Sequence, residues 1–150
     1  MYSKILVPLD GSELAECSLE HVKDIATGCH IPEVILLAAV EPAEEAMPAF
    51  WGAVAGAQTR LETDKMGGTT SAIDYGQMMS EQKAAVEKKQ GEYAGSYLTK
   101  VAQGLTKSGL NVSTCVVIGK PAESILNFAR DNGVDFIVIA THGRGGSARW

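Results

Sequence analysis

Four short apolar runs divide the chain into predicted strands. They are rich in branched side chains and lie at residues 5–9, 34–40, 112–118 and 136–140. Apart from Ser113 and Thr114, they show little of the polar–apolar alternation that marks a strand with one solvated face. Runs without alternation are typical of parallel strands that helices cover on both faces. The pattern therefore predicts an α/β fold.

Apolar residues at helical spacing fill the gaps between these strands. Ser12 favours the N-cap of a first helix that Gly28 ends, and its apolar positions are Ala15, Leu19, Val22 and Ala26. A second helix is predicted over about 80–108, before Gly109, on the four-residue spacing of Tyr93, Tyr97, Val101 and Leu105.

A third helix is predicted between Pro121, which suits a first turn, and Gly133. Its residues expected to face the sheet are Ile125, Leu126, Phe128 and Ala129. Strands and helices thus alternate, and right-handed crossovers make the sheet open and doubly wound, flanked by helices on both faces. In such sheets a ligand lies at the carboxyl ends of the strands.

The segment from about 42 to 80 has no strand pattern and is predicted to be a long surface excursion. It contains several glycines and a Phe50-Trp51 pair. A connection of this length within a compact domain is usually functional or disordered. The aromatic pair either caps a pocket or partner surface, or packs the excursion onto the domain.

The length of the chain and its 45% of hydrophobic residues predict a single domain over residues 1–150. No apolar run approaches the ~18 residues of a membrane span, and no secretory signal is evident at the start, so we expect a cytoplasmic protein with no membrane partner. The cysteines, Cys17, Cys29 and Cys115, have no paired spacing and are expected to be reduced and mostly buried.

The net charge of −5 argues against a nucleic-acid partner, which would require a basic face. The charge is uneven along the chain. Residues 1–80 carry 12 acids and 4 bases, whereas residues 81–150 carry 6 acids and 9 bases. The glycine-rich end contains Arg144 and Arg149 and suits a small anion.

Two segments carry candidate chemistry. Asp10 directly follows the first strand, where its carboxylate either accepts hydrogen bonds from a ligand or only stabilises its own turn. After the last strand, residues 141–147 read Thr-His-Gly-Arg-Gly-Gly-Ser. Backbone amides in such a loop can cradle a phosphate, and the alternative is a flexible linker. Neither a Walker A loop nor a dinucleotide fingerprint is present.

The sequence offers no evident reaction centre. The three histidines do not gather with other ligands, so no metal site is predicted. No GxSxG elbow occurs, and no serine or cysteine can be paired with a base. The pattern thus favours a binding site without catalysis.

Residues 4–12 (Lys-Ile-Leu-Val-Pro-Leu-Asp-Gly-Ser), 119–122 (Gly-Lys-Pro-Ala) and 135–146 (Asp-Phe-Ile-Val-Ile-Ala-Thr-His-Gly-Arg-Gly-Gly) together resemble the universal stress protein family. The resemblance spans nearly the whole chain except 42–80. It implies a Rossmann-like fold, a homodimer, and binding of ATP or another adenine nucleotide, with or without Mg²⁺. It also implies a stress-response role exerted by binding, with at most slow ATP hydrolysis.

The same resemblance implies which residues bind the nucleotide. Adenine and ribose would be surrounded by the first two strand ends, and phosphates would be held by the glycine loop. The expected residues are Pro8, Leu9, Asp10, Ala39, Val40, Ile139, Ala140, His142, Gly143, Arg144 and Gly145. Of the family signature Gly-x2-Gly-x9-Gly-[Ser/Thr], Ala140 occupies the first glycine position and Gly143 the second. The third position would lie past Trp150.

Two other functions compete with nucleotide binding. A family member without nucleotide would serve as a protein-interaction module, which the alanine at position 140 favours. An adenylating enzyme of the ATP-pyrophosphatase group would need a phosphate loop directly after the first strand. Asp10 and Glu13 would repel phosphates there, so this third reading is disfavoured.

Overall fold

The computed structural model describes residues 1–42 and 72–140. In this part of the chain four strands form one parallel sheet in the order β3-β2-β1-β4. The elements in chain order are β1 (Lys4–Pro8), α1 (Glu13–Gly28), β2 (Glu33–Val40), α4 (Ala72–Thr106), β3 (Val112–Ile118), α5 (Pro121–Asp131) and β4 (Phe136–Ile137). The predicted α/β fold with a doubly wound parallel sheet is confirmed.

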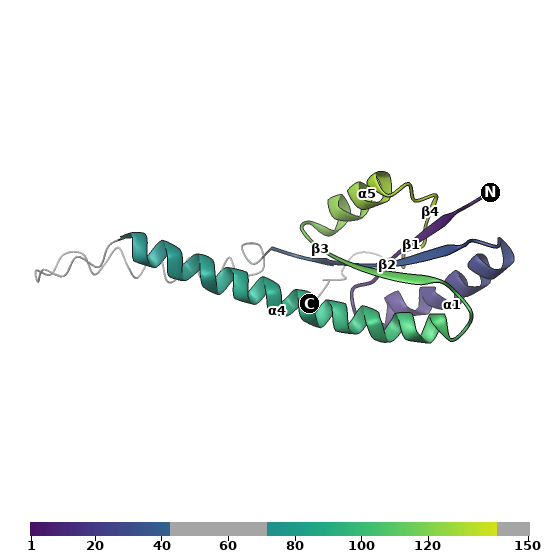
Figure 1. The fold of residues 1–150 in the computed structure, drawn as a ribbon, viewed down its shortest axis with the longest axis horizontal. Helices are drawn as coiled ribbons and strands as arrows, with labels where there is room; N and C mark the ends of the chain where they lie inside the picture. The colour runs from purple at the N-terminus through teal and green to yellow at the C-terminus, as the bar shows by residue number, and fades with distance from the viewer. Residues whose placement is uncertain (43–71, 141–150) are drawn as a thin grey trace, which may run out of the picture.

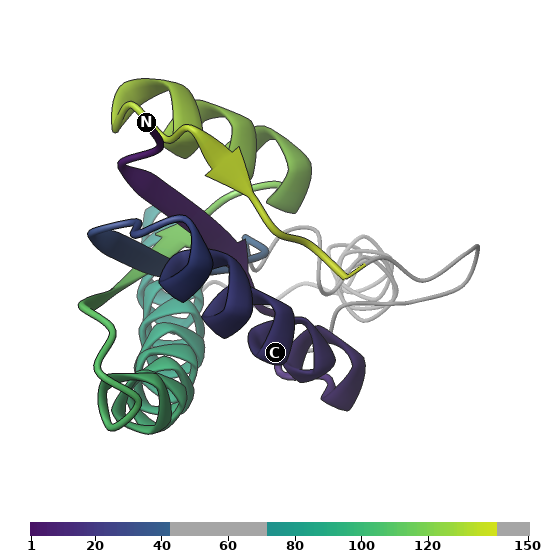
Figure 2. The same cartoon turned by 90° about the vertical axis from the view of Figure 1, so that its right-hand side faces the viewer.

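Helices cover both faces of this sheet. Figure 2 shows α5 on one face and α1 with α4 on the other. Side chains on the α1 and α4 face form the larger core, which includes Val7, Val22 and Leu98. A smaller core around Leu6 and Leu37 lies under α5. Every crossover therefore returns to the sheet by burying one apolar stripe of its helix.

The strands differ in how fully they are covered. Seven of the eight residues of β2 are buried, as expected for a central strand between helical layers. Strand β3 lies at the edge of the sheet, and Ser113, Thr114 and Ile118 are exposed. Strand β4 lies at the other edge, and Ile137 is 37% exposed. The expectation of cover on both faces therefore holds for β1 and β2 and is wrong for β3 and β4, because helices cover the edges of the sheet only in part.

Helix α4 is longer than predicted and extends beyond the sheet (Figure 1). Its buried residues are Ala94, Leu98 and Leu105, whereas the Tyr93 side chain is 73% exposed. An exact four-residue repeat turns about 40° further round the helix at each step, because one turn takes about 3.6 residues. The predicted apolar line therefore leaves the core at its Tyr93 end.

The same geometry corrects the face of α5. Ile125, Phe128 and Ala129 pack toward the sheet at i, i+3 and i+4, as predicted. Leu126 is 64% exposed, because it lies about 100° round the helix from Ile125.

The expected burial of the cysteines is also wrong in part, since Cys17 and Cys29 are exposed on α1 and just after it. Cys115 is half-buried, and all three thiols are free.

Strand β4 pairs with β1 over two residues only, and not over the predicted 136–140. The Val138 N–H still donates to the Leu6 carbonyl at 2.9 Å, so the chain continues alongside β1 after β4 ends. Ile139 is 50% exposed to solvent, and the residues that follow Ala140 lie outside the described part of the chain.

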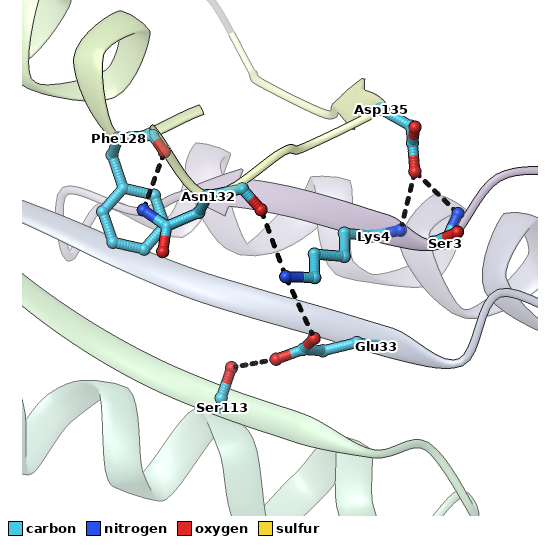
Figure 3. A network of polar contacts seen from close by, with 7 residues as sticks. All are labelled: Ser3, Lys4, Glu33, Ser113, Phe128, Asn132 and Asp135. Carbon is cyan, nitrogen blue, oxygen red and sulfur yellow. Dashed lines mark hydrogen bonds and ion pairs between the residues drawn. The ribbon is translucent and has the colours of Figure 1, made fainter. Parts of the chain in front are cut away.

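A polar cluster fastens the amino ends of three strands (Figure 3). Asp135 Oδ2 accepts from the backbone N–H groups of Ser3 and Lys4, at 2.7 and 3.1 Å. The Lys4 ammonium donates to the Asn132 carbonyl at 3.1 Å and lies 3.9 Å from a Glu33 carboxylate oxygen. The backbone bonds hold the pKa of the Asp135 carboxyl below its ordinary value.

Truncating Leu98 tests the larger core. Leu98→Ala removes a fully buried side chain and leaves a cavity, so it should lower the free energy of unfolding by about 2–5 kcal/mol. Leu126→Ala makes the same chemical change on the exposed face of α5 and should change stability by less than about 0.5 kcal/mol. Urea unfolding of both variants measures the difference, and equal effects would contradict the described packing of α4.

The Asp135 cluster should make stability depend on pH. Its folded pKa is lowered, so the stabilisation is present above the ordinary pKa of 3.8 and is lost as the pH falls through the lowered value. Asp135→Asn has no charge to lose. The stability difference between wild type and Asp135→Asn should therefore shrink from pH 7 to pH 3 in urea titrations, and a constant difference would refute the role of the charge.

Candidate functional site

The winding of the chain creates one topological switch point, between β1 and β4. From β1 the chain passes through α1 to β2 and then through α4 to β3, both on one side of β1. Helix α5 then carries it back to β4, on the other side of β1. Connections leave in opposite directions at this point, and ligands of open α/β sheets bind beside the carboxyl ends of the strands at such a switch point. This edge of the sheet is the candidate binding site.

Asp10 lies at this edge, two residues after β1. The Leu9 N–H donates to the Leu37 carbonyl at 2.8 Å and holds the chain against β2, and Gly11 then turns with φ of 76°. This left-handed conformation strains residues other than glycine. The strand end and the glycine turn together fix the backbone position of Asp10.

The Asp10 carboxylate is bonded through one oxygen. Its Oδ1 accepts from the Ser12 N–H at 3.0 Å and from the Ser12 hydroxyl at 2.6 Å. The Ser12 hydroxyl in turn accepts from the Ala15 N–H at 3.1 Å and caps α1, as the sequence predicted. Asp10 therefore stabilises its own turn through Oδ1, and within the described residues Oδ2 accepts no hydrogen bond.

Tyr97 on α4 faces the start of α1. Its hydroxyl donates to Glu16 Oε1 at 2.9 Å. Burial, the Glu16 carboxylate and the more distant charge of Asp10 all raise the pKa of Tyr97, so the hydroxyl stays protonated. Sequence reasoning used Tyr97 only as an apolar position. A tyrosine at an apolar position of a predicted helix suggests that its hydroxyl has a polar partner. The local sequence does not identify that partner as Glu16 on α1.

Tyr97 and Glu16 also line a groove of about 370 Å³ between α1 and α4. Lys23 and Lys100 lie on its two sides. None of the predicted site residues in the described part lines this groove.

Strand register brings the predicted site residues from three strands to one edge. Pro8 pairs with Leu37, so continuing the register places Asp10 beside Ala39. Leu6 pairs with Ile137, and the same continuation places Ile139 beside Pro8, with Ala140 following.

The side chains at this edge differ in what they can offer. Those of Leu9 and Val40 are buried in the core, so these two residues present only backbone groups to the edge. Ala39 is also buried, and Ala140 is half-buried. Of the predicted residues in the described part, Asp10 therefore supplies the one charged group.

The rest of the predicted site, His142, Gly143, Arg144 and Gly145, lies outside the described residues. The Phe50-Trp51 pair of the excursion, for which two roles were left open, also lies outside them. In residues 1–42 and 72–140, no group of three or more His, Cys, Asp or Glu side chains is placed to hold a metal ion. The same ranges contain no helix that is both long and apolar enough to cross a membrane.

Comparisons with known proteins agree with this architecture. The chain is 31% identical over 144 residues to Universal stress protein MJ0577 from Methanocaldococcus jannaschii, an alignment that covers 96% of this chain and 79% of that protein. The solved structure of MJ0577 superposes with a TM-score of 0.68 at 29% identity, over 96% of this chain and 78% of that one.

A second solved structure, Universal stress protein UspA from Lactobacillus plantarum, shares the fold. Its TM-score is 0.57 at 20% identity, over 98% of this chain and 84% of that one. The model of the universal stress protein family matches residues 1–150, the full sequence. The chain therefore belongs to the universal stress protein family.

Proposed function

We propose that this protein binds ATP or another adenine nucleotide at the carboxyl edge of the sheet, and that it acts by binding and not by catalysis. The observation that carries the proposal is the Asp10 carboxylate at the β1/β4 switch point, with Oδ2 left as an acceptor among the described residues. Membership of a family in which adenine nucleotides are expected ligands supports the choice of ligand.

Charge decides the orientation of the nucleotide. Asp10 would repel phosphates, so the adenosine end lies beside β1, where Oδ2 accepts from a ribose hydroxyl or another ligand donor. Backbone groups of Leu9 and Val40 border this end. The phosphates then extend toward the loop of His142, Gly143, Arg144 and Gly145, whose amides and guanidinium suit an anion, and any Mg²⁺ would accompany them.

A protein-interaction module is the second candidate function. The part of α4 that extends beyond the sheet in Figure 1 favours it, because an isolated helix in water is marginally stable and gains from a packing partner. Tyr93, 73% exposed near the start of the sheet-bound part, is the largest exposed apolar group among the side chains of α4 that the structure describes. A partner bound to α4 in this way does not exclude nucleotide binding at the carboxyl ends of β1 and β4.

Asp10→Ala tests the nucleotide proposal. Removing one partner of a buried hydrogen bond costs about 1–3 kcal/mol, so adenosine and ATP should both bind roughly 10- to 100-fold more weakly. Calorimetric titration of both ligands measures this loss. A loss for ATP alone would place Asp10 on the phosphate side and contradict the proposed orientation.

Ser12→Ala is the matched control for that variant. It breaks the same cap of α1 and should cost about 1 kcal/mol of stability, while leaving Oδ2 of Asp10 in place. Its nucleotide affinity should stay within about threefold of wild type, a difference of about 0.6 kcal/mol. If Ser12→Ala weakens binding as much as Asp10→Ala, the effect comes from the turn and not from a carboxylate contact.

Arg144→Ala tests the phosphate end. A charge-assisted hydrogen bond contributes about 1.5–3 kcal/mol when well formed, so ATP should weaken more than adenosine. Salt screens such a contact, so the difference between the two ligands should narrow as ionic strength rises. Titrations at two salt concentrations measure it, and equal losses for both ligands would leave Arg144 without a phosphate contact.

A further inference from the structure

The groove of about 370 Å³ between α1 and α4 lies outside the proposed nucleotide site. Both helices lie on the same face of the sheet (Figure 2), and each leads from one parallel strand to the next, so they run in the same direction. The α4 residues that line the groove extend from Tyr97 to Leu105, a rise of about 12 Å along the helix. The groove is therefore long enough for a small ligand that lies along both helices.

The floor of the groove is apolar. Leu105 is buried in the larger core, and Leu19 and Val101 pack against that core. Gly104 also lines the groove, and a Cβ built on it would meet no atom within 4 Å. Helix α4 thus leaves space above its own apolar side chains. An apolar chain can lie on this floor without a shift of either helix.

Two lysines stand on opposite sides of this floor. Lys23 lines the groove from α1 and Lys100 from α4. Within the described ranges, neither ammonium is paired with a carboxylate. A lysine can lay its methylene stem on apolar surface and keep its charged end in water. The groove therefore combines apolar surface with two positive charges, which complements a ligand with an apolar body and an anionic head.

One acid lines the groove, and it lies at the opposite end from Lys23. The Glu16 carboxylate accepts a hydrogen bond from the Tyr97 hydroxyl at 2.9 Å, and these are the first lining residues of α1 and α4. Lys100 follows Tyr97 by about one helical turn, and Lys23 follows Glu16 by about two turns. The negative charge is thus confined to one end. An anionic head is attracted to the lysines and repelled by Glu16, which fixes the direction of the ligand.

We propose that this groove binds a small amphipathic carboxylate with an unbranched apolar chain. The chain lies on Leu19, Val101 and Leu105, and the carboxylate accepts hydrogen bonds from Lys23 and Lys100. Burial of the chain favours binding in proportion to the apolar area that it covers, and the charge-assisted bonds select an anionic head.

The size of the groove favours a small molecule over a partner protein. Small-molecule sites usually have volumes of about 300–1,000 Å³, and this groove lies within that range. Stable protein interfaces bury about 1,200–2,000 Å², which is more than a groove about 12 Å long can supply. The ligand is therefore a compact amphipathic anion.

Titration with decanoate tests the proposal on the full chain. Decanoate should bind saturably, with a Kd of about 1 mM or tighter. Acetate has the same head without the chain, and decyltrimethylammonium has the same chain with a positive head. Each should bind at least about tenfold more weakly, because each lacks one of the two complementary features. Absence of saturable decanoate binding would overturn the proposal, and so would equal binding of decanoate and decyltrimethylammonium.

Substituting the lysines tests the head of the ligand. A chain with Lys23→Gln and Lys100→Gln should bind decanoate about tenfold more weakly, and the loss should narrow as salt screens the charges. A chain with Lys88→Gln and Lys89→Gln loses the same charge from exposed positions of α4 outside the groove. Its affinity should stay within about twofold of wild type. Equal losses in the two double variants would mean a general effect of net charge and would overturn the proposal.

Filling the groove tests the place of the apolar chain. Gly104→Leu puts a side chain into the open space and replaces glycine by a better helix former, so the melting temperature should not fall. Decanoate should bind at least about tenfold more weakly, because the new side chain occupies the floor. Gly91→Leu is the matched control, since a Cβ on Gly91 also meets no atom within 4 Å and Gly91 lies outside the groove. Wild-type affinity in Gly104→Leu would place decanoate elsewhere and overturn the proposal.

NMR of the methyl groups gives the position of the ligand directly. Decanoate should shift the methyl signals of Leu19, Val101 and Leu105, and it should leave that of Leu126, exposed on α5, unchanged. Shifts confined to other methyl groups would overturn the proposal.

Nucleotide affinity separates this inference from the proposed function. Asp10 does not line the groove, so Asp10→Ala should leave decanoate titrations unchanged. Gly104→Leu should likewise leave ATP titrations unchanged. Failure of one proposal does not decide the other.

Discussion

Both faces of this parallel sheet must be covered by helices, so the chain adds β2 and β3 on one side of β1 and β4 on the other side. The arrangement of the helices and of the candidate site depends on this change of direction at β1. Right-handed crossovers through α1 and α4 can cover only one face while the chain moves from β1 to β3. The other face of Leu6 and Leu37 stays open to water until α5 crosses it and delivers β4 to the far side of β1. The switch point between β1 and β4 is thus a consequence of burying the core.

The turn after β1 couples folding to the candidate site. Asp10 and Ser12 share hydrogen bonds that begin α1, and α1 in turn buries Val22 and Ala26 against the sheet. One carboxylate oxygen serves the turn. A ligand bound as proposed would meet a carboxylate that its own turn already holds in place, which would lower the ordering cost of binding.

Sequence periodicity was sufficient for elements whose environment is uniform along their length. The runs that became β1 and β2 are buried over most of their length, so composition alone identified them as strands that helices cover on both faces. Periodicity was insufficient where the environment depends on distant parts of the chain. It could not predict that β3 lies at an edge, because the order of strands is decided by crossovers and not by residues 112–118 themselves.

Side-chain errors have a similar cause. Tyr93 and Leu126 belong to apolar patterns, but their exposure depends on a few tens of degrees of helix rotation and on where the sheet ends. Cys17 and Cys29 were expected inside because cysteine is usually buried, and a residue average carries no information about helix face. The position of Asp10 was predictable, since a strand end followed by glycine fixes it locally.

Helix α4 connects the two sides of the larger core. The Tyr97 hydroxyl donates to Glu16 on α1, and Thr99 lines a groove of about 460 Å³ beside β3. The buried residues Ala94, Leu98 and Leu105 hold α4 against the sheet, and shifting them would open cavities. The packing of one helix therefore fixes how α1 and the edge strand β3 lie relative to each other.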